Sequence, residues 1–370
     1  MKILLLGDYS NYHACLGDAL RQLGHTVVVA SDGGGFMKTE ATIALRRCLP
    51  GPAGGALLYA QMLADRRLRG FDVVSLIAPS FVTLRPARLR KLYKHLRRCN
   101  GGIFLGSVGT DKAIMDFLLA PDCPLRYSEY MNGGELYKPN AAVLRENALW
   151  QQGDIAHWCE ELYDSVDGVT TALYEYHLAM QRRLDNDRLA YTGIPVDLGS
   201  IKLLDRPLAA DGCVNLFLGV KSARNVFKGT DRIGAVARRL AREFPDRCRL
   251  TSVTDMPYRE YLAAMRSADI VLDQLYSYSP ATNALQAMAA GQAVLSGGEN
   301  EFYDFISEPA LRPVINCSPS EDEIYATLKE YVLNPEKVVE AGKQGRQFVK
   351  KHNDSLTVAA RHLKFWNEKL

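Results

Sequence analysis

Short apolar runs of strand length alternate with helical patterns along this chain, and the alternation occurs twice. In the first half, the strand candidates are residues 2–6, 26–30, 72–77, 102–105, 168–171 and 189–192. Apolar residues at helical spacing separate them, at residues 13–23, 56–68, 86–98 and 141–163. Strands without polar alternation that are separated by helices predict a parallel sheet covered on both faces.

The alternation breaks once and then restarts. Periodicity fails between Gly193 and Gly212, as is typical of an interdomain connection. New strand candidates are residues 214–220, 249–253, 270–272 and 293–295. Helical patterns accompany them at residues 231–244, 258–266, 280–290, 321–331, 335–350 and 355–367. The sequence therefore predicts two doubly wound α/β domains that face a cleft, residues 1–205 and 206–350, with a C-terminal helix in residues 351–370.

Composition excludes several classes of protein. The 370 residues are 24% charged and 47% hydrophobic, which argues against disorder and collagen. A formal net charge of +3 shows no nucleic-acid footprint. No run approaches the roughly 18 apolar residues that span a bilayer, so we expect a cytoplasmic protein. The eight cysteines form no C-x-x-C pair, which argues against a zinc knuckle and a secreted disulfide framework.

Ligands of open parallel sheets bind where strands end, so the loops after the predicted strands are candidate sites. Gly7 opens the loop after the first strand, and His13 closes it. This loop lacks the G-x-G-x-x-G pattern, which argues against a dinucleotide cofactor.

The helix predicted at residues 280–290 has well-defined ends. Ser279 is suited to the N-cap, Pro280 to the first helical position and Gly291 to the stop. Backbone amides at such a helix start can bind an anion such as phosphate, and here they belong to Ala281, Thr282 and Asn283.

Gln286 lies one turn beyond Thr282 on the same helix face, within reach of a sugar or ribose beside that phosphate. The alternative is a buried helix whose Ser279 hydroxyl satisfies the amides itself.

Three cations occupy the loop after the strand at residues 214–220: Lys221, Arg224 and Lys228. Lys228 precedes a predicted helix start, where a cation is unfavourable unless an anion lies between them. Lys221 and Arg224 can flank the same position. The alternative is a solvated basic loop.

Several segments together resemble the GT-B glycosyltransferases, especially the glycosyltransferase 4 clan (group 1). The C-terminal ones are Lys228-Gly229 and residues 269–275 and 287–294. Residues 193–197 resemble the linker motif N-G-I-D, and Val108-Gly109-Thr110-Asp111 resembles the acceptor-domain loop H-G-T-D. The resemblance covers nearly the whole chain in the family's order.

This resemblance implies two Rossmann-like domains and retaining transfer of a sugar from a nucleoside diphosphate sugar, such as a UDP- or GDP-sugar. It implies neither a protein nucleophile nor an obligatory metal, and no cofactor besides the donor. Lys228 with Lys221 or Arg224 would neutralise the departing diphosphate. The loop at residues 254–257 is the candidate for base recognition. The implied donor-binding residues are Gly7, Lys221, Arg224, Lys228, Gly229, Thr254, Ser279, Ala281, Thr282 and Gln286.

The sequence departs from the family pattern at three positions. Tyr278 and Gln286 stand where the family commonly has the two glutamates of E-x7-E, and Val108 replaces the acceptor-loop histidine. Asp111 and His13, with Lys228, remain as candidate catalytic residues. Asp111 could instead cap the following helix, and His13 could cap or begin the first one.

From Arg85 to Arg98 the chain carries seven cations, no acid and an apolar stripe. This helix could contact anionic lipid at the inner face of a membrane, which suits a glycan or glycolipid acceptor. An amphipathic helix that covers a sheet has the same pattern.

Two other functions remain open. A nucleotide-sugar 2-epimerase shares the predicted architecture but would need carboxylates and histidines in the cleft. A degenerate GT-B scaffold in a glycan assembly pathway would explain Tyr278, Gln286 and Val108.

Overall fold

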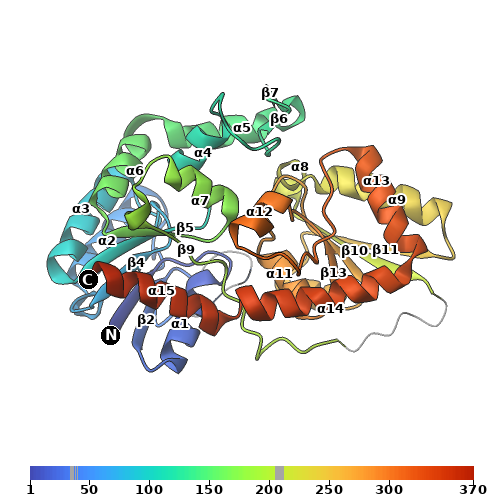
Figure 1. Ribbon diagram of the computed structural model, residues 1–370. Coiled ribbons are helices and arrows are strands. Elements are labelled where there is room, and N and C mark those ends of the chain that lie inside the picture. The colour runs from blue at the N-terminus through green and yellow to red at the C-terminus, as the bar shows by residue number, and fades with distance from the viewer. Residues whose placement is uncertain (34–36, 38, 40, 205–211) are drawn as a thin grey trace. The chain divides into compact units, whose positions relative to one another are not determined.

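The chain divides into two compact units in the computed structural model, which describes all residues except 34–36, 38, 40 and 205–211 (Figure 1). The first unit comprises Met1–Ala120, Glu146–Pro195 and Ser355–Leu370. The second comprises Pro121–Arg145 and Val196–Asp354. The predicted boundary at 205/206 lies outside the described residues, and the division falls at Pro195/Val196 instead.

The first unit is built on a parallel sheet, as predicted. Over the described residues its strand order is β3-β2-β1-β4-β5-β8-β9. The strands are β1 (Lys2–Leu6), β2 (Thr26–Ser31), β3 (Ile43–Ala44), β4 (Val73–Leu76), β5 (Gly102–Ser107), β8 (Gly168–Thr171) and β9 (Leu189–Tyr191). The residues of β4 and β5 are buried throughout, because helices cover both faces of the sheet.

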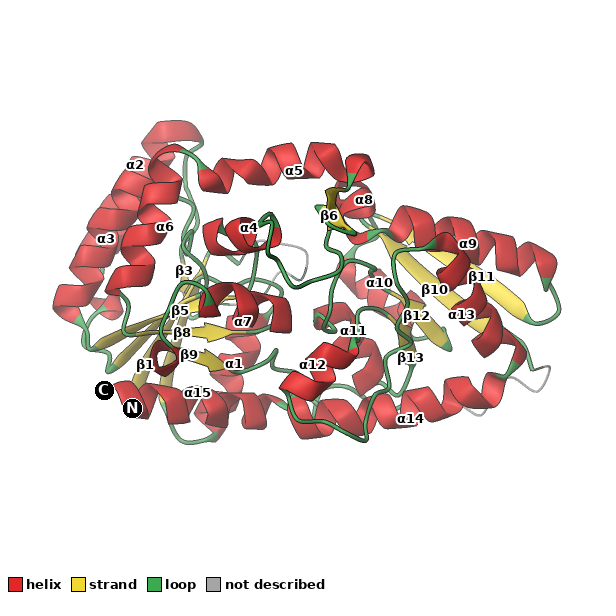
Figure 2. Ribbon diagram, turned by 45° about the horizontal axis from the view of Figure 1, so that its top comes forward, coloured by secondary structure: helices red, strands yellow, loops and turns green. Residues whose placement is uncertain are grey.

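The helices of the first unit include one from the far end of the chain. They are α1 (Tyr12–Gln22), α2 (Gly51–Ala64), α3 (Pro86–Cys99), α4 (Lys112–Leu118), α6 (Gly153–Ser165), α7 (Tyr174–Gln181) and α15 (Ser355–Lys369). Helix α15 packs beside α1 (Figures 1 and 2). Its Phe365 ring lies 5.8 Å from the Phe104 ring of β5. The C-terminal helix therefore completes the N-terminal sheet's cover.

The second unit contains a smaller parallel sheet. Its strands are β10 (Val214–Val220), β11 (Cys248–Thr254), β12 (Ile270–Leu272) and β13 (Ala293–Leu295), in the order β11-β10-β12-β13 over the described residues. The helices are α8 (Asn225–Lys228), α9 (Thr230–Glu243), α10 (Tyr258–Met265), α11 (Thr282–Ala289), α12 (Asn300–Phe305), α13 (Glu321–Leu333) and α14 (Pro335–His352). The predicted apolar face of α9 is buried and packs with α13 (Figure 1).

The long helix expected at residues 141–163 is wrong as a single element. The chain forms α5 (Ala141–Asn147), a 3₁₀ turn (Ala148–Gln151) and α6. Gln152 is extended and Gly153, the first residue of α6, has φ of +57°, so the backbone is not helical between the 3₁₀ turn and α6. Most of α5 belongs to the second unit, whereas α6 belongs to the first.

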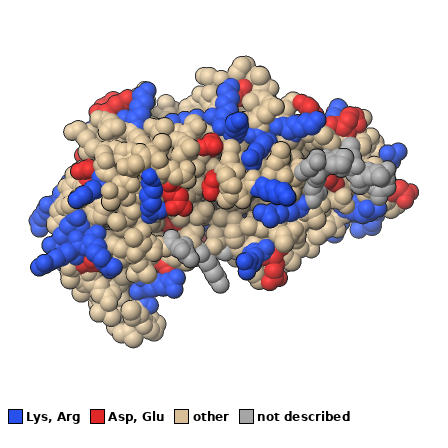
Figure 3. All heavy atoms as spheres, turned by 90° about the horizontal axis from the view of Figure 1, so that it is seen from below, with Lys and Arg blue, Asp and Glu red and all other residues tan. Residues whose placement is uncertain are grey.

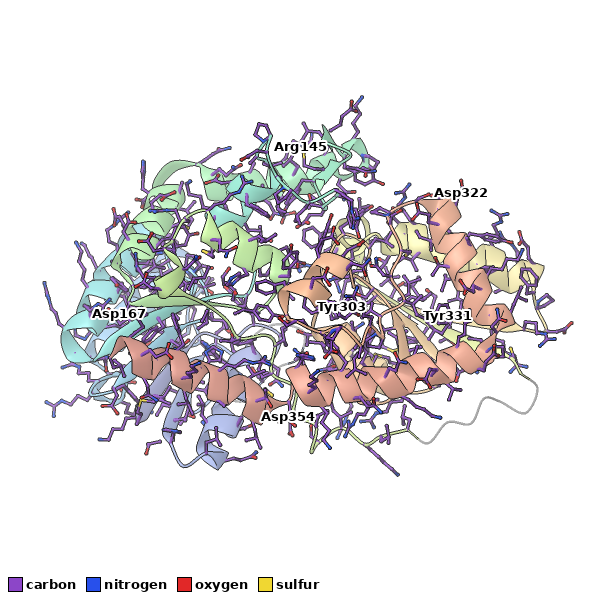
Figure 4. The ribbon with its side chains drawn as sticks, in the orientation of Figure 1. Arg145, Asp167, Tyr303, Asp322, Tyr331 and Asp354 are labelled. Atoms are coloured by element: carbon purple, nitrogen blue, oxygen red, sulfur yellow. The ribbon has the colours of Figure 1, made fainter. Side chains whose placement is uncertain are left out.

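Residues 121–145, which we call the strap, leave the first unit and fold onto the second. The strap carries a hairpin of β6 (Met131–Asn132) and β7 (Glu135–Leu136). Its Tyr137 ring lies 5.6 Å from the Tyr276 ring. Arg145 and Asp354, both labelled in Figure 4, are residues at which the chain leaves the second unit. The sequence patterns did not predict this excursion.

The basic helix α3 packs its apolar stripe into the first unit, which confirms the interpretation of residues 86–98 as an amphipathic helix that covers the sheet. Its Leu89, Leu92, Tyr93 and Leu96 are buried. Arg90 pairs with two carboxylates of α6, and Arg97 pairs with Asp167 (Figure 4).

Basic and acidic side chains are interspersed on the face seen in Figure 3. In the described part of the chain, no helix is both long enough and apolar enough to cross a membrane.

Candidate functional site

Lys228 is positioned by its backbone at the carboxyl ends of the strands of the second unit. It ends α8, and Gly229, with φ of +70°, turns the chain into α9. The Leu275 N–H donates to the Lys228 carbonyl at 3.0 Å. A Cβ at Gly229 would lie 2.8 Å from Leu275 Cδ1, so the close approach requires glycine. Lys228 is thereby fixed beside the loop that follows β12.

Asp273, the first residue of that loop, is only 3% exposed and collects three donors. Its Oδ1 accepts from Lys228 Nζ at 3.2 Å and from Asn283 Nδ2 at 3.1 Å. Its Oδ2 accepts from Ser296 Oγ at 3.4 Å. The anion that stabilises the Lys228 ammonium near the start of α9 is therefore the Asp273 carboxylate of the protein itself. The Lys228 side chain is still 29% exposed, so a second anion can reach its ammonium group.

Helix α11 begins two residues later than predicted. Its first residue is Thr282, and Ala281 occupies the N-cap position with φ of −94°. The assignments of Ser279 as N-cap and Pro280 as first helical residue are therefore wrong, and Ser279 is buried. Because an alanine side chain has no acceptor, the first-turn amides of α11 have no side-chain cap. A helix start of this kind favours an anionic ligand.

Two tyrosines of α10 bond to polar residues of α11. The Tyr258 hydroxyl donates to Gln286 Oε1 at 3.1 Å, and the Tyr261 hydroxyl donates to Asn283 Oδ1 at 2.8 Å. Burial raises the pKa of both phenols, so both are neutral near pH 7. We call Tyr258, Gln286, Tyr261, Asn283, Asp273 and Lys228 the polar row.

The other two cations of the loop after β10 have different partners. Lys221 lies 3.8 Å from Asp255, which also accepts from the Ser222 N–H at 3.2 Å. The Arg224 guanidinium is exposed and lies 5.5 Å from the Phe227 ring centre. Thr254 ends β11 beside this cluster and is exposed.

Tyr278, which aligns with the first glutamate of E-x7-E, fastens the strap. It is 1% exposed, and its oxygen accepts from the Arg126 N–H at 2.6 Å. The Tyr127 ring lies 5.1 Å from the Tyr278 ring. Arg126 and Tyr127 both donate to the buried carboxylate of Glu299. Tyr278 therefore attaches the strap to the rest of the second unit, and its side chain is buried in that contact.

Gly7 and His13 belong to the first unit. His13 is the second residue of α1, so the interpretation that it begins this helix is confirmed. Its Nδ1 bonds to the Gly7 carbonyl at 2.7 Å and its Nε2 to Ser75 Oγ at 3.2 Å. Burial lowers the pKa of His13 to about 4, so the ring is neutral near pH 7. Gly7 has φ of +81°, and a Cβ there would lie 2.4 Å from Ile77 Cγ2.

Asp111, also in the first unit, caps α4. Its Oδ1 accepts from the Ile114 N–H at 3.2 Å, which confirms the capping alternative. The carboxyl is buried beside α6, where burial and the charge of Asp111 raise the pKa of Tyr163 and Cys159. Burial raises the pKa of Asp111 itself to about 6. The side chain is thus turned into the packing between α4 and α6.

A match to a known protein family covers most of the second unit and part of α15. Residues 221–364 match a family model described as glycosyl transferase-like. Over these residues the chain is similar to the glycosyl transferase-like family. The match begins at Lys221, just after β10, and includes every residue of the polar row. No curated protein sequence was found to match the chain.

Solved structures extend the likeness to the whole glycosyltransferase fold. Sucrose-phosphate synthase from Thermosynechococcus elongatus is 15% identical, with a TM-score of 0.61 and coverage of 100% of this chain and 98% of that one. Anabaena HepE, solved with UDP and glucose, is 13% identical, with a TM-score of 0.60 and full coverage of both chains. WaaG, a glycosyltransferase of lipopolysaccharide biosynthesis, is 14% identical, with a TM-score of 0.56 and coverage of 98% and 99%. The fold is therefore GT-B.

Four residues of the polar row were not predicted as site residues. They are Asp273, Asn283 as a side-chain ligand, Tyr258 and Tyr261. Asp273 had a usable signal, because an acidic residue directly after a buried strand is placed at the ligand-binding edge of the sheet. The tyrosines had none, since their partners are set by how α10 packs beside α11.

Within the described part of the chain, no group of three or more His, Cys, Asp or Glu side chains could hold a metal ion. The polar row offers one partly exposed ammonium, two carboxamides and two phenols, and the uncapped amides of α11 lie beside it. These groups suit a ligand with an anionic end and a hydroxylated end.

Proposed function

We propose that this chain transfers a sugar from a nucleoside diphosphate sugar to a glycan or lipid-linked acceptor. The observation that carries the proposal is the partly exposed ammonium of Lys228, which Asp273 holds near the uncapped start of α11. A diphosphate would meet this ammonium and the amides of Thr282 and Asn283. The HepE complex with UDP, on the same fold, supports a uridine nucleotide, and a guanosine nucleotide is the alternative.

The polar row would act on the leaving group. Departure of the diphosphate leaves negative charge on its oxygens, and a positive charge already in place lowers the barrier to that step. Lys228 would supply it, with Lys221 and Arg224 as further cations from the same loop. We propose a retaining outcome without a protein nucleophile or bound metal, on the strength of the family resemblance.

The rest of the donor would extend from the diphosphate along the second unit. Gln286, half-buried on α11, would bind the ribose, and the loop from Thr254 would contact the base. Gly7, in the first unit, is a donor-binding residue on the strength of the family resemblance alone. The catalytic roles of His13 and Asp111 have less support, because both side chains are buried and bonded within the first unit.

A second candidate is a degenerate scaffold that binds a nucleotide sugar or a partner without transfer. The burial of Tyr278 favours it, because a glutamate at that position is lost and its replacement is used for packing. An epimerase has less support, since Asp273 is the only carboxylate of the polar row and is already paired.

Calorimetric titration with UDP, GDP and their sugar conjugates, with and without magnesium, tests the donor site. We expect micromolar, metal-independent binding that falls at least tenfold in Lys228→Ala, because a charge-assisted contact to phosphate is lost. Arg224→Ala, in the same loop, is the matched control and should change the affinity less. Turnover of a bound sugar nucleotide then separates an enzyme from a scaffold.

Lys228→Ala leaves the Asp273 charge buried without its ammonium partner and could unfold the unit. The double variant Lys228→Gln/Asp273→Asn removes both charges and keeps both shapes. If this variant folds and binds the nucleotide as tightly as the wild type does, the diphosphate assignment is wrong.

We further propose that α3 contacts anionic lipid near the acceptor. Lys91, Lys94 and Arg98 are exposed on the side of the helix away from its buried stripe, and Arg85, the residue before the helix, is exposed as well. Co-sedimentation with vesicles of phosphatidylglycerol should exceed that with phosphatidylcholine, and replacing these four residues with glutamine should abolish the difference. Equal binding of wild type and variant would contradict this contact.

A further inference from the structure

The loop of residues 273–281 connects the two charged parts of the candidate site. It begins at Asp273, which bonds to Lys228, and it ends at the N-cap residue of α11. Between these ends the side chains of Tyr276 and Tyr278 are buried. The path of this loop therefore sets how the Lys228 ammonium lies relative to the uncapped amides of α11.

The strap covers both buried tyrosines of this loop. Its Tyr137 ring lies 5.6 Å from the Tyr276 ring. Its Tyr127 ring lies 5.1 Å from the Tyr278 ring, and the Arg126 guanidinium lies 5.7 Å from the centre of that same ring. The middle of the loop is therefore packed against the strap, while the two ends of the loop carry the groups that would meet a diphosphate.

Glu299 holds the strap with its side chain. The residue is 7% exposed, and its carboxylate accepts hydrogen bonds from the Tyr127 hydroxyl and the Arg126 guanidinium. Arg126 also lies 3.4 Å from Glu301, but that carboxylate is exposed, so water weakens the pair. A buried carboxylate that loses its donors is costly, so Glu299 favours the attached strap.

Glu299 holds the 273–281 loop with its main chain. The Glu299 N–H donates to the Tyr278 carbonyl at 3.0 Å. A Cβ at Gly297 would overlap the Ser277 carbonyl oxygen, so the two backbones are in direct contact there. One residue thus bonds to the strap on one side and to the loop on the other.

We propose that Glu299 is a positioning residue for the diphosphate, and that attachment of the strap and binding of the nucleotide are coupled through the 273–281 loop. This inference rests on the proposed nucleotide-sugar function. Glu299 acts through the loop and does not itself contact the ligand. The coupling is reciprocal: if the attached strap strengthens binding, the bound nucleotide must in turn favour the attached strap.

Hydrogen exchange of the full chain with and without saturating UDP tests the coupling directly, with GDP used if the wild type prefers it. Amides within residues 121–145 should exchange about fivefold more slowly in the bound protein. Amides of β1 and β4 should be unchanged. A strap that served only to stabilise the fold would show no such protection. This measurement needs no variant, so it applies even if a substitution prevents folding.

Glu299→Gln keeps the size of the side chain and removes the charge that pairs with Arg126. The folded variant should bind UDP and inorganic diphosphate about fivefold more weakly, and its strap should exchange faster than that of the wild type. Arg126→Gln should have the same effects. The double variant should lose no more affinity than either single variant, because both substitutions remove the same attachment.

Glu308→Gln is the matched control, because Glu308 is another buried carboxylate of the second unit. It is 1% exposed and pairs with Lys351 Nζ at 2.6 Å and with His352 Nε2 at 2.6 Å, at the end of α14. Its substitution should lower the melting temperature. The affinity of the folded variant for UDP and the exchange of its strap should stay as in the wild type.

Three outcomes would overturn the assignment of Glu299. In the first, bound UDP leaves exchange within residues 121–145 unchanged. In the second, folded Glu299→Gln has a faster-exchanging strap but binds UDP as the wild type does. In the third, Glu308→Gln weakens UDP binding as much as Glu299→Gln does. If the wild type binds no nucleotide and no diphosphate, the proposed function fails first, and the coupling fails with it.

Discussion

A single buried carboxylate organises the charged end of the polar row. Asp273 accepts hydrogen bonds from Lys228 and Asn283, one from each side of the β12 edge. A cation near a helix start is unfavourable on its own, and Asp273 offsets that cost while it fixes where the ammonium lies. The sequence predicted Lys228 but not its partner, because the pairing depends on the turn at Gly229 and on the Leu275 contact.

At Gly229, substitution by alanine should be costly. The residue combines φ of +70° with a Cβ position 2.8 Å from Leu275 Cδ1. Gly70 has φ of +76° and nothing within 4 Å of its Cβ position, so Gly70→Ala measures the backbone strain alone. Chemical denaturation should show a loss of roughly 1 kcal/mol for Gly70→Ala and clearly more for Gly229→Ala. Equal losses would mean that the contact with Leu275 relaxes without cost.

Asp111 allows a test that separates capping from catalysis. Asparagine caps a helix as well as aspartate does, and it carries no buried charge. Because burial raises the pKa of Asp111 to about 6, we expect Asp111→Asn to be at least as stable as the wild type at pH 8. Asp111→Ala should lose about 1 kcal/mol in denaturant titrations. A folded Asp111→Asn protein whose transferase rate is more than tenfold lower would instead indicate a catalytic carboxylate.

At the scale of elements, the sequence predicted what periodicity determines. Most strands of both sheets were placed within one or two residues, because buried parallel strands are continuous apolar runs. The two-residue strand β3 was missed, because so short a strand has no recognisable sequence pattern. The interruption of residues 141–163 was also missed, because Gly153 lies within a sequence pattern that is otherwise helical.

The strap could not be predicted at all, because its attachment depends on contacts with residues far along the chain. Tyr278→Phe removes the acceptor of the Arg126 N–H and leaves the ring in place. We expect the second unit to lose about 1–2 kcal/mol, because a buried donor is left unsatisfied. Hydrogen exchange should increase within residues 121–145 and remain unchanged in the β1 and β4 region. Uniform exchange across the chain would contradict a local role for Tyr278.

At the scale of the whole molecule, buried histidines make stability depend on pH. Burial lowers the pKa of His13 to about 4 and that of His362 to about 3, whereas an unfolded chain has histidines near 6.5. Below pH 6.5 the unfolded state therefore binds protons that the folded state does not, so the free energy of unfolding falls as pH falls toward 4. Each fully buried histidine accounts for a loss on the order of 3 kcal/mol. Asp111 works in the opposite direction, because its raised pKa makes the folded state bind a proton first.

Urea denaturation at pH 7.5 and pH 5 measures this dependence. The wild type should be less stable at pH 5, and His362→Gln should show a smaller difference between the two pH values. His362 Nε2 contacts the Tyr12 hydroxyl at 3.1 Å, so glutamine can keep a polar contact there. A wild type that is equally stable at both values would contradict the neutral, buried state of these rings.

The strap and α15 also determine when each unit can fold during synthesis. The chain passes between the units after Ala120, Arg145, Pro195 and Asp354, so neither unit is one continuous segment. The first unit lacks its α15 cover until residues Ser355–Lys369 have been translated. The strap, which belongs to the second unit, is translated about fifty residues before the rest of that unit, so it cannot pack until Val196–Asp354 follow. Nascent chains would therefore expose apolar surface of the first unit until α15 has been translated, and a gene cut at Pro195 would produce two incomplete fragments in place of two domains.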